Sequence, residues 1–564
     1  MHATEPRAAH PRRRGRRAAL VALALWSAGC SPIDRAQLWA RIGSSDAQLT
    51  LASAYALGEG VAQDGREALR WYHEAAAQDR REAWVALAEL YGEGELVEAD
   101  PEAALGWYER LAETGGAEEQ LELAERLRSG ERVDADLNAS LRWFERAAAS
   151  GSVEAAKEAG LAHLRGEGTL RDFGRAAEWL EQAAEGGNPD AQNALGVLHT
   201  HDYGPPRDYA VAARWFLSAA EQGHLEAQRN LSAMYAAGLS VEGDTAEALR
   251  WLRSAAEGGL RSAQEELAKA HATGELGLAP DRDRARHWYR LAAEQGSADA
   301  AGRLVEWFEA DAAEAGHSDP AGLLELLLLA AETGDRDAQA RVAEAYSDGL
   351  GTEPDAELAM QWALRSAEQG HAGAQNRVGV LYHRGQGVEQ DYEEAYRWFR
   401  RAANLGDLDA KANIAFQLLN GDGVARDRKQ GMKLLREAAE AGHPGAQLDL
   451  GMRYRAGAGV DRDPEVAYRW VRAAAETSHA RALNQLGILH LRGIGTAVSP
   501  VVALALFRIA ESQGEEAASI NRRRLEEALD PSERARADQQ EAVIRAELAE
   551  QAAARASDEA PAAS

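Results

Sequence analysis

Apolar and small residues recur along most of the chain with the spacing of amphipathic α-helices. In "GAQNRVGVLYH" (residues 373–383) and "EEAYRWFRRAA" (residues 393–403) they stand three and four positions apart, which places them on one face of a helix. Glycines separate the two segments, and a further Gly follows the second. Because Gly readily adopts the left-handed conformation that closes a helix, the pattern predicts two antiparallel helices joined by a "GxG" loop.

This pair of segments returns with a period of 36 residues, marked by tryptophan. The spacing is 36 from Trp71 to Trp251; later, one interval is 37 and one is 38. Leu replaces Trp at Leu326, Leu434 and Leu506. We interpret the tryptophans as packing residues, sealed inside the joints between helix pairs. They are Trp71, Trp107, Trp143, Trp179, Trp215, Trp251, Trp288, Trp362, Trp398 and Trp470.

Two further columns of the repeat define its second helix. Seven residues before the Trp column stands Asp, or Ser499 in the last copy, and such side chains accept hydrogen bonds from the first turn of a helix. The residue after the column is apolar in every copy, for example Phe144, Phe216 and Phe399, and Ala dominates four and five positions after it. Small residues beside large ones indicate a helix that approaches its neighbours closely.

Residues 373–406, "GAQNRVGVLYHRGQGVEQDYEEAYRWFRRAANLG", resemble a Sel1-like repeat, a relative of the tetratricopeptide repeat with a period near 36. Thirteen copies of this kind run from residue 46 to 514. The resemblance implies an all-α fold, a right-handed α-solenoid of helix-turn-helix repeats. It also implies scaffold or adaptor work through protein contacts, which is the usual role of the family.

The remaining segments precede and follow this array of repeats. "DPSERARADQQEAVIRAELAEQ" reads as a closing helix with a capping box, and solenoids need such polar ends. The expected organisation is a signal peptide (1–29), a lipidated N-terminus with a short linker or capping helix (30–45), the repeats (46–514, irregular at 276–329), closing helices (515–551) and a disordered tail (552–564).

The irregular region suggests a second kind of surface. Between 276 and 329 the interval lengthens, Leu326 replaces Trp and the run "LLELLLLA" occurs. One interpretation is a bend that carries an apolar docking patch at Leu323, Leu324 and Leu328. The alternative, which we favour, is a decayed repeat whose extra leucines are buried.

The first thirty residues have the order of a secretory signal peptide. Six arginines precede an apolar run that starts at Ala18, and Ser27, Ala28 and Gly29 lead to Cys30. This order resembles a bacterial lipobox, which implies lipidation of Cys30 and a membrane anchor. Ser31 after the cysteine points by the same analogy to the outer membrane, with the chain facing the periplasm or the cell surface. The alternative is an ordinary signal peptide with an incidental cysteine.

No motif of the usual catalytic kinds occurs, so we expect no enzyme activity, cofactor or metal. Gly385 and Gly387 read as a turn rather than a phosphate loop, because they follow a helix and not a strand. His224, His371, His443 and His479 share one column between repeats and read as turn residues. If Cys30 is lipidated, the mature chain keeps no thiol, since Cys30 is the single cysteine.

The net charge of the chain indicates which classes of partner it favours. Removal of residues 1–29 takes away six arginines and one glutamate, which moves the formal charge from −28 to −33. Such a surface repels nucleic acid and favours basic partners or divalent cations, although it also simply keeps a long array soluble. We therefore expect an envelope lipoprotein that acts as a scaffold for unidentified envelope proteins.

Two alternatives stay open. Exopolysaccharide-export scaffold lipoproteins join a lipobox to similar repeats, and this architectural resemblance suggests a narrower role of that kind. A β-lactamase-like or peptidoglycan-acting enzyme is the other class. The family members described in this way carry paired cysteines in each repeat, and the mature chain has none.

Overall fold

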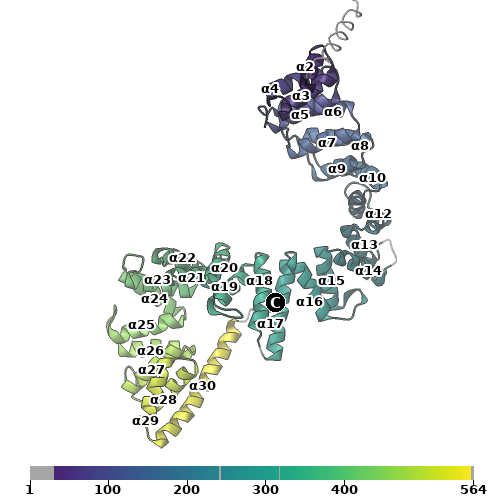
Figure 1. Ribbon diagram of the computed structural model, residues 1–564. Helices are drawn as coiled ribbons and strands as arrows, with labels where there is room; N and C mark the ends of the chain where they lie inside the picture. The colour runs from purple at the N-terminus through teal and green to yellow at the C-terminus, as the bar shows by residue number, and fades with distance from the viewer. Residues whose placement is uncertain (1–30, 240–242, 317, 560–564) are drawn as a thin grey trace, which may run out of the picture. The chain divides into compact units, whose positions relative to one another are not determined.

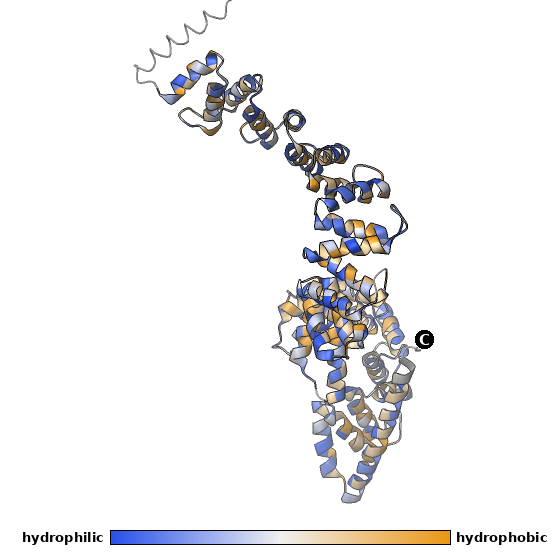
Figure 2. Ribbon diagram, turned by 90° about the vertical axis from the view of Figure 1, so that its right-hand side faces the viewer, coloured by the Kyte–Doolittle hydropathy of each residue, from blue (hydrophilic) through white to orange (hydrophobic). Residues whose placement is uncertain are grey.

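The computed structural model describes residues 31–239, 243–316 and 318–559, and within these ranges it contains helices and no strand. The predicted all-α fold is therefore confirmed. The chain divides into two compact units, Met1–Ala285 and Arg286–Ser564, and the division falls inside helix α16 (Arg282–Glu294). Apolar and polar residues alternate within the individual helices (Figure 2).

The first unit is a row of helical hairpins (Figure 1). In each hairpin an odd-numbered helix, here called the first helix, precedes an even-numbered second helix. The elements are α2 (Pro32–Arg41), α3 (Ser45–Leu57), α4 (Gly65–Ala76), α5 (Arg81–Glu93), α6 (Pro101–Thr114), α7 (Ala117–Ser129), α8 (Leu137–Ala149), α9 (Val153–Arg165), α10 (Phe173–Glu185), α11 (Pro189–Thr200), α12 (Tyr209–Glu221), α13 (Leu225–Ala237), α14 (Thr245–Glu257), α15 (Arg261–Thr273) and the short η1 (Glu275–Gly277).

The second unit continues this order. Its helices after α16 are α17 (Ala298–Ala315), α18 (Pro320–Glu332), α19 (Arg336–Asp348), α20 (Ala356–Glu368), α21 (Ala372–Arg384), α22 (Tyr392–Asn404), α23 (Leu408–Asn420), α24 (Arg428–Glu440), α25 (Pro444–Ala456), α26 (Pro464–Glu476), α27 (Ala480–Arg492), α28 (Pro500–Ser512), α29 (Glu516–Ala528) and α30 (Pro531–Glu559). The prediction of disorder from residue 552 needs correction, because residues 552–559 continue α30.

Each second helix begins where the acidic column predicted. Asp136 accepts a hydrogen bond from the Ala139 amide at 2.9 Å, and Asp391 accepts from the Glu393 and Glu394 amides, both at 2.9 Å. The column contributes a cap in every copy, including Ser499 in α28. Asp530 and Glu533 cap α30 reciprocally, which is the predicted capping box.

The "GxG" loops are turns, as predicted. Gly385 ends α21 with φ = +65°, and Gly387 has φ = +69°. A side chain at Gly387 would collide with the carbonyl oxygen of Ala356 at the start of α20. The second glycine is therefore required because the loop lies directly against the preceding second helix.

In the core of several hairpins, a large side chain of one helix packs against a glycine of the other. Phe216 in α12 is 2% exposed, and a Cβ atom built at Gly196 in α11 would lie 2.7 Å from its Cε1 atom. Phe399 and Phe507 meet Gly379 and Gly487 in the same way. In these hairpins the two helices approach closely because one of them offers only backbone at the contact.

The joint between consecutive hairpins contains a buried hydrogen bond. Gln192 in α11 is 3% exposed and its Nε2 atom donates to the carbonyl oxygen of Ala184 in α10 at 3.0 Å. The same bond recurs for Gln48, Gln120, Gln228, Gln264, Gln339, Gln375 and Gln447, each to the carbonyl eight residues earlier.

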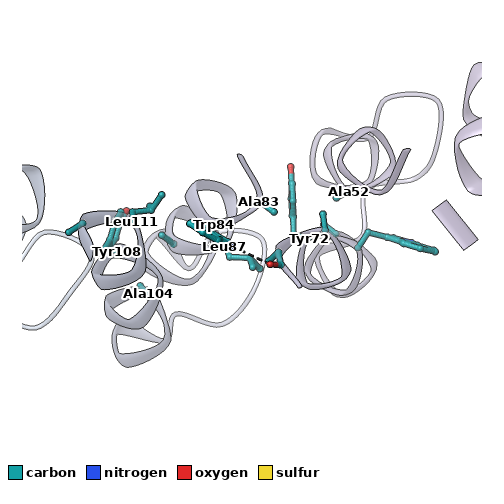
Figure 3. Packing of buried hydrophobic residues seen from close by; sticks show 14 of the residues in the cluster. Ala52, Tyr72, Ala83, Trp84, Leu87, Ala104, Tyr108 and Leu111 are labelled. Atoms are coloured by element: carbon teal, nitrogen blue, oxygen red, sulfur yellow. Dashed lines mark hydrogen bonds between the residues drawn. The ribbon is translucent and has the colours of Figure 1, made fainter. Parts of the chain in front are cut away.

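Trp84 occupies this position in α5, and its Nε1 atom donates to the Ala76 carbonyl oxygen at 3.3 Å. Figure 3 shows Trp84 and Leu87 of this helix between Tyr72 of α4 and Tyr108 of α6. In these joints the hydrogen bond satisfies a carbonyl near the end of the preceding helix, which fixes the register of one hairpin on the next.

Some of these glutamines make a second hydrogen bond. Gln192 Oε1 accepts from Gln222 at 2.8 Å, whereas Gln447 Oε1 is buried without a partner. We expect Gln192→Leu to lower the free energy of local opening by about 1–3 kcal/mol, because it leaves buried polar groups unpaired. Gln447→Leu should cost less, since it also removes an unsatisfied oxygen.

Amide hydrogen exchange in α11 and α25 measures both effects locally, which suits an array that opens in parts. Gln386→Leu, in an exposed loop, is the matched control. Equal losses at the two joints would contradict this account of the glutamine column.

Candidate protein-interaction surface

The tryptophan column lies at the contacts between hairpins. Trp143, for example, packs against the hydrophobic clusters on both sides of α8. Four of the rings are buried, with 7–8% exposure: Trp71, Trp251, Trp362 and Trp398. The prediction that all the rings are sealed is wrong for the other six, which are half-buried: Trp107, Trp143, Trp179, Trp215, Trp288 and Trp470.

Arginines cover the exposed side of several indoles. The guanidinium carbon lies 4.4 Å from the ring centroid in the pairs Arg250–Trp251, Arg365–Trp362 and Arg401–Trp398. Such stacking is a favourable cation–π contact that also shields the ring face from water. These tryptophans therefore belong to the packing of the second helices and do not offer a free aromatic platform.

The leucine-rich helix α18 is mostly packed rather than exposed. Leu324 is 6% exposed and belongs to the core, and Leu323 and Leu328 are half-buried. The interpretation as an exposed docking patch is thus wrong for Leu324, whose burial agrees with the favoured alternative of a decayed repeat with buried leucines. Leu323 and Leu324 nevertheless line a cavity of about 300 Å³ with Phe308 and Leu350. Here α17 has 18 residues and the "GxG" loop is absent from the described part.

The first helices carry the side chains that link neighbouring hairpins across one face, here called the first-helix face. Arg229 Nε donates to Glu266 Oε1 at 2.8 Å, and Arg377 pairs with Glu344 at 3.2 Å. Arg81–Glu119, Arg128–Glu158 and Arg341–Glu309 pair in the same way. Asparagine pairs replace them at Asn193–Asn230, Asn376–Asn413 and Asn484–Asn521.

A groove of about 600 Å³ lies on this face in the second unit, between α19, α21 and the start of α23. Asp337, Glu344, Asp348, Asp407 and Asp409 line it together with Arg341, Arg377, Arg384 and His371. Burial raises the pKa of Asp407, and the hydrogen bond from His443 lowers the pKa of Asp409. The Asp337, Glu344, Asp348 and Asp409 side chains are more than half exposed, so a basic group could reach these carboxylates from solvent.

The column of His224, His371, His443 and His479 caps first helices, a role the turn interpretation missed. His443 Nδ1 accepts from the Ala446 amide at 2.9 Å, and its Nε2 contacts Asp409 Oδ1 at 2.6 Å. His224 and His371 contact Asp190 and Asp337 in the same way. The signal was available in the sequence, because Ser44, Ser152 and Asn188 occupy the same column in other copies.

The described residues include no group of three or more His, Cys, Asp or Glu side chains placed to hold a metal ion. In the same residues no helix has both the length and the apolar character needed to span a bilayer. Cys30, the predicted lipidation site, lies outside the described residues.

The Sel1 repeat model matches twelve segments of this sequence: 45–79, 82–115, 120–152, 153–188, 189–224, 225–260, 261–297, 336–371, 372–407, 408–443, 444–479 and 480–515. The chain belongs to the Sel1 repeat family. Of the thirteen predicted copies, only the irregular one at α17–α18 is unmatched, consistent with its longer helix and missing Trp. No curated protein matches the chain.

Solved structures of Sel1 repeat proteins resemble this chain. A protective antigen of uropathogenic Escherichia coli with the SLR fold is 27% identical, over 88% of this chain and 98% of its own, with a TM-score of 0.39. A Sel1 repeat protein of Oxalobacter formigenes is 28% identical, over 65% and 93%, with a TM-score of 0.32. Sel1 repeat proteins generally mediate protein–protein interactions, and their fold is typically a non-catalytic scaffold.

The repeat core predicts unequal effects of two adjacent residues. Phe216→Ala should lower stability by about 3–5 kcal/mol, as for a fully buried ring, and Trp215→Ala by less. Gly196→Ala should destabilise the wild type, because its Cβ would meet Phe216, but should be tolerated beside Phe216→Ala. Hydrogen exchange in α11 and α12 measures each variant. A larger loss for Trp215→Ala would refute this ranking.

Acid should destabilise the fold through its histidines. Burial lowers the pKa of His73, His271, His479 and His490. Since the folded-state pKa lies below the unfolded value of about 6.5, the unfolded chain binds more protons between the two. Stability is then fully present above about pH 6.5 and is lost as pH falls toward the folded-state pKa.

Urea unfolding between about pH 7.5 and about pH 5.5 tests this titration. His479→Asn keeps an acceptor for the Ala482 amide and should remove part of the acid sensitivity. His201→Asn, at an exposed position, should leave it unchanged. A wild-type midpoint that is constant over this range would contradict the prediction.

Proposed function

We propose that this protein is an envelope lipoprotein, anchored in the outer membrane through Cys30, whose repeats bind one or more other envelope proteins. The sequence order of arginines, apolar residues, small residues and Cys30 supports the anchor. Membership of the Sel1 repeat family supports protein binding. The observation that carries the proposal is the union of these two features in one chain.

The described structure supports a position of the first hairpins close to the bilayer surface. Helix α2 begins at Pro32, two residues after Cys30, and packs against α3. A lipidated Cys30 would therefore connect to the first hairpin without a long linker. Several acyl chains hold a protein firmly, because each buried methylene contributes about 0.8 kcal/mol.

The first-helix face supports the binding role. Its ion pairs and amide pairs join neighbouring hairpins, so the side chains beside them are held in a regular array. Ordering that is complete before a partner arrives reduces the entropy cost of association. Few of these positions need to supply affinity, since a handful of anchors dominates most interfaces.

Metabolic labelling with palmitate tests the anchor. The wild-type chain should incorporate label and fractionate with the outer membrane, and Cys30→Ser should do neither. Label that persists in Cys30→Ser would refute lipidation at this residue. Label in the wild type with fractionation to the inner membrane would refute only the assignment to the outer membrane.

Photo-crosslinking in intact cells tests protein binding. A photoreactive residue at Arg384, in the groove of the first-helix face, should capture an envelope protein. The same residue at Lys433, exposed on α24, should not. Capture of an outer-membrane polysaccharide porin would support the exopolysaccharide-export alternative, and capture from Lys433 alone would refute the assigned face.

A further inference from the structure

Helix α2 stands where the second helix of a repeat would stand, at the N-terminal end of the first unit (Figure 1). Gln48 Nε2 donates to the Ala40 carbonyl oxygen at 3.3 Å, which is the joint that Gln192 makes with Ala184. With Cys30 as the first residue of the mature chain, as proposed, two residues precede α2. Two residues cannot form the first helix that would complete this hairpin.

The uncovered side of α2 carries a tryptophan. In the 36-residue period Trp39 takes the position of Ala75 and Ala147, each of which is 0% exposed. A regular second helix such as α4 packs against first helices on both sides, α3 and α5, whereas α2 packs against α3. Trp39 is therefore 36% exposed, and no other tryptophan of the described chain reaches this exposure.

Two further residues extend this surface, here called the α2 face. Ile42 directly follows the helix and is 52% exposed, although other repeats carry polar residues such as Gln78 and Ser150 at its position. Arg35 is exposed as well. Spacings of four and three residues place Arg35, Trp39 and Ile42 on one side of the helix. The α2 face is thus apolar with a basic group, at positions that are small or polar elsewhere in the array.

We propose that the α2 face lies on the phospholipid surface of the membrane, with Trp39 and Ile42 inserted among the lipid headgroups and Arg35 beside lipid phosphates. This inference rests on the proposed anchor at Cys30, because a chain tethered at that residue holds α2 against the bilayer.

The geometry of α2 suits this contact. Ser31 and Asp34 cap the start of the helix, so α2 begins directly after the proposed anchor. Trp39 follows Pro32 by seven residues, which is about 10 Å along the axis at 1.5 Å per residue. A helix that lies in the membrane surface buries its apolar side about 5–10 Å into the headgroup region. Tryptophan is enriched at this depth because its ring is apolar and its N–H is polar.

The charge near α2 is compatible with phospholipid. Residues 31–44 contain Arg35, Arg41 and one carboxylate, Asp34, and a guanidinium group pairs with phosphate through two parallel hydrogen bonds. The acidic repeats farther along the array are screened, since the Debye length is about 8 Å at physiological salt.

A second copy of the chain is a less suitable occupant of the α2 face. The face consists of three large side chains on a helix of 10 residues. Stable protein interfaces bury about 1,200–2,000 Å² in total, which so short a helix does not offer by itself. Insertion into a bilayer needs no matching surface of that size.

A footprint of the unaltered chain tests the contact without cellular acylation. Cys30, the single cysteine, is coupled to a maleimide phospholipid in phosphatidylcholine–phosphatidylglycerol vesicles, or to a soluble maleimide for comparison. Hydroxyl radicals should modify Trp39 several-fold more slowly on the vesicles, as read by mass spectrometry. Tyr203, exposed in the loop after α11, should react equally in both samples. Equal modification of Trp39 would overturn the proposal.

Partition into vesicles measures the strength of the contact. One myristoyl chain on Cys30 gives reversible binding of about 10⁴ M⁻¹, so a contribution from α2 is measurable by vesicle sedimentation. Trp39→Ala/Ile42→Ser should partition about tenfold more weakly than the wild type, which corresponds to about 1.4 kcal/mol. Leu170→Ser, at a position that is 88% exposed in the loop before α10, is the matched control and should partition as the wild type does.

Equal partition of the double variant would contradict the contact. So would a wild-type dimer in sedimentation equilibrium that the double variant abolishes, because a second copy would then cover the α2 face. The footprint stays valid if the double variant disturbs α2, since it uses the unaltered chain.

The outcomes separate this contact from the anchor. Both measurements attach the lipid chemically, so they do not depend on acylation in the cell. Tight partition without palmitate labelling would reject lipidation at Cys30 and keep the affinity of α2 for the bilayer. Palmitate labelling with equal partition would keep the anchor and reject the contact.

Discussion

No hairpin in this array can cover its own apolar surface, and the rest of the structure depends on how neighbouring hairpins meet. Inside a hairpin, Phe216 packs against the bare backbone at Gly196. Between hairpins, Gln192 satisfies the carbonyl of Ala184 in a site closed to water. The first contact sets the distance between helices, and the second sets their register. Dispersion forces alone would tolerate a slide of one hairpin along the next, but a buried amide does not.

This constraint explains what could be predicted from the sequence. Aspartate caps, glycine loops and the apolar residue after the Trp column each repeat every 36 residues, so the helices and their order follow from local rules. The exposure of individual indole rings does not follow from these local rules. Trp215 and Trp251 stand in the same column, yet one is half-buried and the other is 8% exposed. Their burial depends on neighbours from adjacent hairpins, which a column of one sequence does not reveal.

The candidate surface likewise has features that depend on tertiary packing and could not be predicted from the sequence. The apolar run around Leu324 allowed two interpretations, an exposed docking patch or a decayed repeat with buried leucines, and only the tertiary packing shows that Leu324 lies in the core. The hydrogen-bond partners of individual arginines could not be predicted from the sequence for a related reason. Arg453 and Arg455 are two residues apart and chemically alike, and only the geometry shows that one has Asp449 beside it and the other has an amide. The net charge of the chain does not distinguish two such arginines.

The glutamine joint also bears on how the gene could have grown. Because nearly the same donor meets a carbonyl eight residues earlier in repeat after repeat, a tandem duplication of one 36-residue unit creates only joints of a kind already present. The added copy would fold without new compensating changes. Its outward positions on the first helix, freed from that packing, are where mutation could then accumulate and recognition diverge.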